Sequence, residues 1–140
     1  MARIRTVKPE FWTDEDLSSI SETAQLMAIG LLNLADDEGF FKSNPKLIKA
    51  ALFPLRDTSM TIHGAISELS SIGYITSYIG VDGKDYAQVT KFTSHQKINR
   101  PSPSKIKGLI DFNEGSVSVH GLITGGKERK GKEQGKEQGT

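Results

Sequence analysis

The sequence contains no cysteine and no long apolar run, and each absence excludes a class of protein. Without a single Cys among its 140 residues, the chain forms no disulfide bond, no thiolate metal site and no cysteine nucleophile. It has no apolar run of about eighteen residues, and it does not begin with the charged, apolar and small-residue pattern of a leader peptide. We therefore expect a cytoplasmic protein with neither a membrane span nor a secretory signal.

Histidine is also scarce and is dispersed along the chain. His63, His95 and His120 have no second ligand at the spacing that metal sites use, so we expect no metal site. The length sets a further limit, because 140 residues suffice for one domain with a core and a tail but not for two ordinary domains.

The net charge is only +1, but the charges are distributed unevenly along the sequence. Residues 9–41 hold eight acids and no Lys or Arg, whereas residues 91–107 hold five basic residues and no acid. Such a separation can make one surface attractive to phosphates although the whole chain is nearly neutral. The alternative is ordinary solvated surface charge, which is the more common origin of any single run of this kind.

The first predicted helix is expected at the centre of the core. It follows Ser21, a good N-cap residue, and runs to about Ala35. Gly39 suits the stop that follows, and residues 40–42 favour a short strand. The apolar residues of one helix face recur three and four positions apart: Ala24, Met27, Ala28, Leu31, Leu34 and Ala35.

Two further helices are predicted from capping residues and apolar spacing. Asn44-Pro45 is a strong helix start, and Pro54 marks the expected stop. The third helix is expected from about Thr61 to Gly73. The buried stripe of the second helix is predicted to consist of Ile48, Ala51, Leu52 and Leu55, and that of the third of Ile62, Ala65, Ile66, Leu69 and Ile72.

A β-hairpin is predicted after the third helix. Residues 74–79 are rich in β-branched and aromatic side chains, and Asp82-Gly83 is a favoured centre for a two-residue type I′ turn. This turn would place Ile79 opposite Tyr86, with the return strand running to about residue 92.

Three helices followed by a hairpin predict an α+β, mainly α, fold of the winged helix-turn-helix type. We expect this domain to span residues 1–107, with basic arms at both ends. Residues 108–140 are expected to form a disordered linker and tail, because they hold few large apolar residues and end in a repeated GKEQ sequence.

No motif supports an enzyme. Residues 121–127 match the first seven positions of a phosphate-binding loop, but Glu128 stands where Ser or Thr should contact magnesium. The acids at 14–16 follow Thr13, a candidate helix cap, and those at 36–38 fit a polar loop. We therefore expect neither catalytic residues nor a cofactor.

Phe11 and Trp12 are adjacent aromatic residues near the N-terminus. The favoured interpretation is that they anchor the N-terminal segment to the core of a small domain. The alternative is a platform on which the bases of single-stranded nucleic acid stack.

Basic residues at both ends of the predicted domain favour DNA binding. His63 and Ser67 lie on the outer face of the third helix, the expected recognition helix. That helix offers no Arg, Lys, Asn or Gln for paired contacts with base edges, so weak sequence specificity is expected. The residues predicted to contact backbone phosphates are Arg3, Arg5, Lys8, Lys46, Lys49, Lys91, Lys97, Arg100, Lys105 and Lys107.

Four phrases, in this order, carry a resemblance to a known family. RIRTVKPEFWTDEDLSSIS, LLNLADDEGFF, NPKLIKAALFP and HQKINRPSPSK together resemble the N-terminal winged-helix domain of phage and prophage replication proteins of the replisome-organiser type. The resemblance covers residues 2–105 and implies binding of origin DNA in a bacterial host cell. In such proteins a C-terminal region engages the host helicase or its loader, whereas this chain ends in the charged repeat.

Two other functions fit the same residues. A small winged-helix transcriptional regulator requires a stable dimer and a palindromic site, because two-fold operators mirror two-fold proteins. A protein-interaction module that recruits host replication factors would explain the missing base-reading side chains. The sequence does not indicate an oligomeric state.

Overall fold

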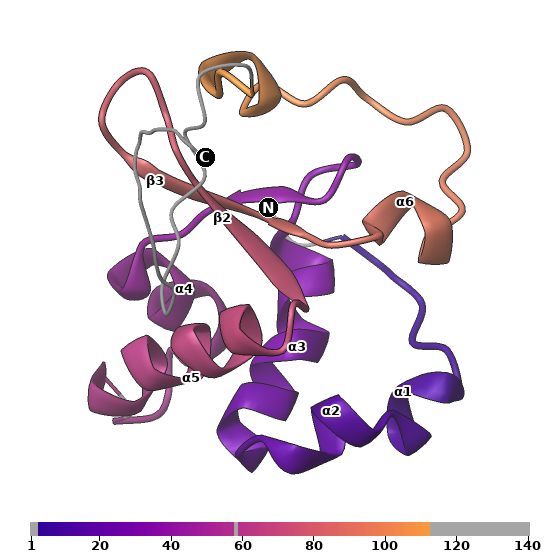
Figure 1. Cartoon of the computed structure of the whole chain (residues 1–140), viewed down its shortest axis with the longest axis vertical. Coiled ribbons are helices and arrows are strands. Elements are labelled where there is room, and N and C mark those ends of the chain that lie inside the picture. The colour runs from indigo at the N-terminus through magenta and orange to yellow at the C-terminus, as the bar shows by residue number, and fades with distance from the viewer. Residues whose placement is uncertain (1–2, 58, 113–140) are drawn as a thin grey trace, which may run out of the picture.

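The computed structural model describes residues 3–57 and 59–112 (Figure 1). It confirms a mainly helical α+β fold with a small antiparallel sheet. None of the helices in the described part is long and apolar enough to cross a bilayer. The elements are α1 Glu10–Thr13, α2 Glu15–Ser19, α3 Glu22–Leu34, β1 Phe40–Lys42, α4 Pro45–Leu52, α5 Ser59–Ser71, β2 Ile75–Ile79, β3 Asp85–Val89, α6 Phe92–His95 and the 3-10 turn η1 Lys107–Leu109.

Helix α3 is the centre of the core, as its apolar spacing predicts. The Ser21 side chain accepts a hydrogen bond from the Ala24 N–H at 3.1 Å and so caps the first turn. The predicted inner face is buried apart from Leu34, which is half-buried. Helices α4 and α5 both pack against α3, so this one helix joins the other two.

Helix α4 begins where predicted but ends sooner. The Asn44 side chain accepts from the backbone N–H groups of Lys46 and Leu47, and Pro45 occupies the first helical position. The predicted burial of Ala51 and Leu55 is wrong, since both are exposed and Leu55 is 97% exposed. The helix ends at Leu52, so Leu55 falls outside its periodicity, while Phe53 leaves the helical conformation and turns into the core.

Helix α5 begins at Ser59, two residues before the predicted start, and packs on α3 and α4. The core-facing residues Ile62, Ala65 and Leu69 are buried as predicted, and Gly73 follows the helix with a φ of +79°. The remaining predicted residues of that face, Ile66 and Ile72, are half-buried against the core.

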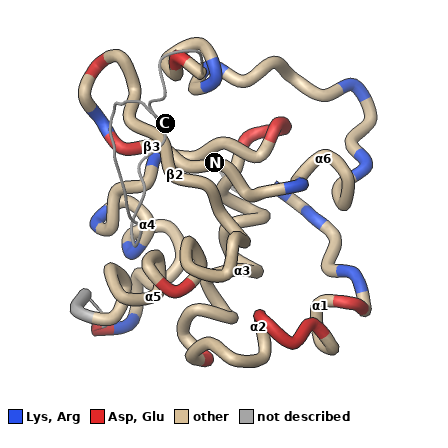
Figure 2. Tube along the Cα trace, in the orientation of Figure 1, with Lys and Arg blue, Asp and Glu red and all other residues tan. Residues whose placement is uncertain are grey.

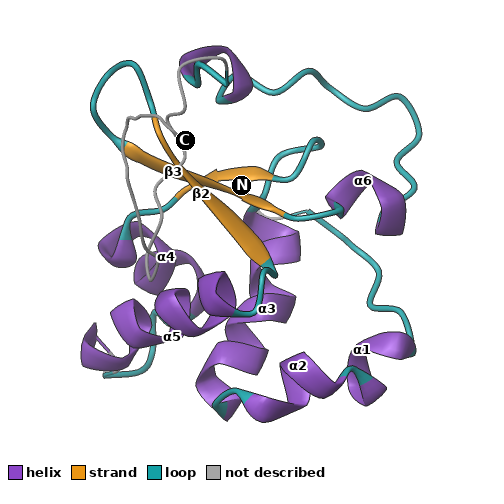
Figure 3. Ribbon diagram, in the orientation of Figure 1, coloured by secondary structure: helices purple, strands orange, loops and turns teal. Residues whose placement is uncertain are grey.

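The strands form one antiparallel sheet in the order β1-β3-β2 (Figure 3). The predicted hairpin register is wrong by one residue, because Ile79 pairs with Asp85 and not with Tyr86. The loop has three residues: Gly80 N–H donates to the Lys84 carbonyl at 2.8 Å, and Gly83 N–H donates to the Gly80 carbonyl at 2.9 Å. Gly83 takes a φ of +81°, which a three-residue hairpin loop requires at its last position.

The two faces of the sheet are covered by different parts of the chain. On the inner face, Phe41, Ile75, Ala87 and Val89 join the core formed with α3, α4 and α5. On the outer face, Ile110 packs with Phe40 and Tyr86 and is only 6% exposed. The predicted domain boundary at 107 therefore falls inside a packed segment that continues to residue 112. The rest of the predicted tail, with the 121–128 motif and His120, lies outside the described residues.

The N-terminal segment forms two short helices before α3. Asp14, and not Thr13 as predicted, caps α2 by accepting from the Leu17 N–H at 3.0 Å. Phe11 packs against the core as expected, but Trp12 is 64% exposed. The prediction that Trp12 anchors this segment is therefore wrong, because Phe11 and Leu17 provide the contacts with the core.

Candidate nucleic-acid interface

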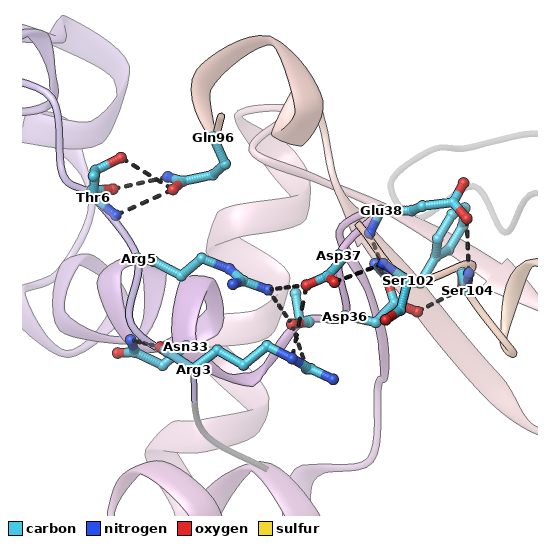
Figure 4. Close-up of polar contacts among 12 residues, drawn as sticks. Arg3, Arg5, Thr6, Asn33, Asp36, Asp37, Glu38, Gln96, Ser102 and Ser104 are labelled. Carbon is cyan, nitrogen blue, oxygen red and sulfur yellow. Dashed lines mark hydrogen bonds and ion pairs between the residues drawn. The ribbon is translucent and has the colours of Figure 1, made fainter. Parts of the chain in front are cut away.

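The first two predicted phosphate contacts, Arg3 and Arg5, face the acidic loop 36–38 (Figure 4). Arg5 Nη2 lies 3.1 Å from both Asp37 Oδ1 and the Ala35 carbonyl oxygen, and the side chain is 6% exposed. Arg3 is 41% exposed and lies 3.7 Å from the same carboxylate oxygen. Arg5 is thus buried in an internal ion pair, which corrects the prediction that it meets DNA. In the folded chain, the carboxylate of Asp37 offsets positive charge of Arg3 and Arg5 that the sequence alone would leave for a partner.

The backbone of this N-terminal segment is also fixed and does not form a free arm. Arg3 N–H donates to the Asn33 carbonyl at 3.0 Å. Gln96, which is buried, accepts from the Thr6 N–H at 3.1 Å and donates to the Thr6 carbonyl at 2.8 Å (Figure 4). Residues 3–6 are therefore tied to both α3 and the end of α6.

The acidic loop binds the C-terminal segment as well. Ser102 N–H donates to Asp37 at 2.9 Å, and Ser104 N–H donates to Glu38 at 2.7 Å. Lys107 Nζ lies 3.3 Å from the other Glu38 oxygen. Lys107, a predicted phosphate contact, is therefore ion-paired, although its side chain remains 57% exposed. One acidic loop thus holds both ends of the described chain.

These contacts favour the charged forms of the loop carboxylates. The Ser102 N–H, with Arg5 beside it, holds the pKa of Asp37 below its ordinary value of 3.8. The Ser104 N–H, with Lys107, holds the pKa of Glu38 below its ordinary value of 4.5. Because both pKa values are lower in the folded state, the stabilisation is fully present above the ordinary values and is lost as the pH falls below them and through the lowered folded-state values.

A double substitution tests this pH dependence. We expect the melting temperature to fall between pH 7 and pH 3 by less in Asp37→Asn, Glu38→Gln than in the unchanged chain, because the variant has lost two of the groups that must be protonated. Melting curves at both pH values measure the difference. Equal falls in the two proteins would contradict a role of these carboxylates in holding the segments.

A group of cations lies where α4 meets the β2–β3 hairpin. Ser43 N–H donates to the Asp85 carbonyl at 3.0 Å, which places the start of α4 beside the start of β3. Lys46 is exposed in the first turn of α4, and Lys84 is exposed in the hairpin next to Asp85. Lys49 follows one turn along α4 and is half-buried. These three lysines form what we call the α4–hairpin group.

Two acids accompany this group. Asp82 accepts hydrogen bonds from the Tyr86 hydroxyl at 2.7 Å and from the Lys84 N–H at 3.1 Å. The first of these bonds is the main reason that the pKa of Asp82 lies below its ordinary value. Asp85 is exposed. Lys84 is not among the phosphate contacts predicted from the sequence. Its position beside the predicted Asp82-Gly83 turn nevertheless indicates an exposed cation at the tip of the hairpin.

Most of the other predicted cations lie around α6. None of these residues forms an ion pair within residues 3–57 and 59–112. Lys8 and Lys91 line one cavity of about 450 Å³ together with His95, so the fold brings together residues far apart in the sequence. The exposed cations around α6 are Lys8, Lys91, Lys97 and Arg100, which we call the α6 group, while Lys105 is exposed just before η1.

The predicted cations therefore do not gather on one surface. In Figure 2 the basic positions of α4 and the hairpin loop lie at the left of the molecule. Those of the N-terminal segment and of the chain directly after α6 lie at the right, whereas those near η1 lie at the top, beside the hairpin. The structure divides most of the predicted set into two groups and leaves Arg3, Arg5 and Lys107 paired with acids.

No protein-family model, curated protein or solved structure matches the chain.

The exposed face of α5 is polar but uncharged. His63 and Ser67 are exposed as predicted, whereas Glu68 turns away to accept from the Ser21 N–H at 2.9 Å and from the Ser21 hydroxyl at 2.8 Å. Within the described residues, no group of three or more His, Asp or Glu side chains is arranged to hold a metal ion.

Proposed function

We propose that this chain is the non-enzymatic, winged-helix DNA-binding module of a phage or prophage replication initiation protein. The element order α3-β1-α4-α5-β2-β3, with α4 and α5 as the helix-turn-helix pair and the hairpin as the wing, supports this fold. The resemblance of the sequence to replisome organisers supports the role in replication.

The observation that carries the proposal is the α4–hairpin group. Lys46 and Lys49 on the first helix of the pair lie near Lys84 of the hairpin and form a basic surface beside α5, in a position to contact backbone phosphates. The neutral surface of α5, with His63 and Ser67, enters the groove without forming paired contacts to bases. Duplex binding by this surface is consequently steeply dependent on salt and only weakly dependent on sequence.

A mobility-shift titration at increasing salt tests the proposal. The triple variant Lys46→Ala, Lys49→Ala, Lys84→Ala is expected to bind every duplex at least about tenfold more weakly, and its slope of log affinity against log salt should be shallower by about 2.7. The reason is the loss of three phosphate contacts, each of which contributes about 0.9 to that slope.

A matched control removes the same charge from the other group. Lys8→Ala, Lys97→Ala, Arg100→Ala is expected to retain most of the duplex affinity, because these cations belong to the N-terminal segment and the chain directly after α6 and not to the surface that α4 and the hairpin form. Failure of the folded, unchanged protein to retard any duplex at low salt would defeat the proposal. Equal losses in the two triple variants would point to net charge alone and would defeat the assigned surface.

A further inference from the structure

We propose that the surface formed by α1, the N-terminal segment and α6 binds single-stranded DNA, with bases stacked on Trp12 and phosphates held by Lys8 and Lys91. The inference deepens the proposed function, on which it rests for the choice of DNA as the polymer. It adds a strand-binding site on a different side of the molecule from the α4–hairpin group.

Trp12 is the first observation. It is the only tryptophan of the chain, and it is 64% exposed at the end of α1. Phe11 packs against it with ring centroids 5.0 Å apart and an interplanar angle of 80°, so the indole is supported while most of it stays open to solvent. A large aromatic ring held at the surface in this way is a stacking platform for a nucleic-acid base, whatever the base.

The cations beside this platform are the second observation. Phe11 lines the cavity of about 450 Å³ that Lys8, Lys91 and His95 also line. Lys97 and Arg100 continue the line of positive charge along the chain that leaves α6, and neither is paired within the described residues. Proteins that bind single strands combine exposed aromatic rings with cations that hold the phosphates, and here the cations lie on the α6 side of the cavity.

Backbone conformation supplies the third observation. In the described part of the chain, Lys91 and Arg100 are the two non-glycine residues with positive φ, at 62° and 57°. This conformation is sterically unfavourable for a side chain with a Cβ, and glycine would adopt it without that cost. Both positions nevertheless carry a cation, Lys91 at the start of α6 and Arg100 in the segment after it. Backbone strain that persists at a position often indicates a functional role for the side chain there.

The acids of the same cavity determine how a strand would lie. Glu10, Asp14 and Asp16 line the side formed by α1 and α2. Phosphates would be repelled there, so the backbone of the strand follows α6 and its bases turn toward Phe11 and Trp12. Asp14 is already engaged as the cap of α2.

Tryptophan fluorescence of the full chain provides a direct test, since Trp12 is the only source of the signal. Titration with an oligothymidylate of about sixteen nucleotides is expected to quench the emission in a saturable manner that weakens with salt. With a labelled oligonucleotide followed by anisotropy, Trp12→Ala should bind about 5- to 150-fold more weakly, the range expected for loss of one stacked base. The matched control is Phe112→Ala, which removes another exposed aromatic ring from the outer side of the sheet and should bind as the unchanged chain does.

Two substitutions at Lys91 separate the cation from the backbone strain. Lys91→Ala and Lys91→Gly should weaken oligonucleotide binding alike and lower the salt slope by about 0.7. Lys91→Gly should nevertheless melt at a higher temperature than Lys91→Ala, because glycine accepts the positive φ. If Lys91→Gly binds the oligonucleotide as tightly as the unchanged chain, the lysine is only a turn residue and the assigned phosphate contact is overturned.

The duplex site and the single-strand site can be contradicted independently of each other. Trp12→Ala should leave the duplex mobility shift unchanged, and the triple variant of the α4–hairpin group should leave the quenching by oligothymidylate unchanged. Absence of quenching at low salt in a chain that still melts cooperatively would overturn the single-strand site even if duplex binding were established. Quenching without any duplex binding would support the single-strand site and defeat the duplex proposal.

Discussion

Replacing Gly39 by alanine is expected to destabilise the fold by about 4 kcal/mol, because backbone strain and overpacking add at this position. Gly39 has a φ of +92°, and a Cβ there would lie 2.5 Å from Phe92 Cβ and 2.8 Å from Phe92 Cγ. Phe92 is only 2% exposed, and its Cβ is fixed by the backbone of α6, so a change of rotamer alone cannot relieve the contact. Urea unfolding of Gly39→Ala and of the unchanged chain measures the difference in unfolding free energy.

Two other glycines serve as controls for this substitution. Gly73 has a similar φ of +79°, but a Cβ there would meet no heavy atom within 4 Å, so Gly73→Ala should show the backbone cost alone, about 1 kcal/mol. Gly64 lies in α5 with open space around it, and Gly64→Ala should stabilise the protein by about 0.5–1 kcal/mol. If Gly39→Ala costs no more than Gly73→Ala, the close contact with Phe92 is not present in solution.

Arg5→Ala is expected to lower the unfolding free energy by about 2–3 kcal/mol. The substitution removes the hydrogen bonds to Ala35 and Asp37 and the contact of the guanidinium with the Phe92 ring, whose centroid lies 5.3 Å away. Part of the loss is offset, because Arg5 Nε is buried without a hydrogen-bond partner among the described residues. Thermal and urea unfolding provide the measurement.

Arg3→Ala is the matched control for Arg5→Ala. Both arginines approach Asp37, but Arg3 is 41% exposed and lies at 3.7 Å, so its loss should cost less than about 1 kcal/mol. Equal costs at the two positions would show that Arg5 is a surface residue in solution. The same variants should leave duplex affinity nearly unchanged if neither arginine contacts phosphates.

The parts of the fold that were predictable depend on local chemistry. Ser21 and Asn44 cap the helices that follow them, and the core face of α3 can be read from spacing alone. The hairpin register was not predictable in this way. Asp82-Gly83 suits both a two-residue and a three-residue loop, and the choice depends on cross-strand pairs such as Tyr78 with Tyr86.

The candidate site was predictable only as a list of cations. Arg5 and Asp37 lie 32 positions apart in the sequence, and no local pattern indicates that they pair. Taken separately, the basic start of the chain predicts a phosphate-binding arm, and residues 36–38 predict a polar loop. Their opposite charges were the available signal that one binds the other.

The segment that crosses the outer face of the sheet bears on how the hairpin meets a partner. Leu109 accepts a hydrogen bond from the Val81 N–H at 2.7 Å, and Ile110 packs against Tyr86 at the base of the hairpin. The hairpin is thus braced from outside its own two strands. Because these contacts already restrict the hairpin in the folded chain, the hairpin loses less conformational entropy when it binds a partner.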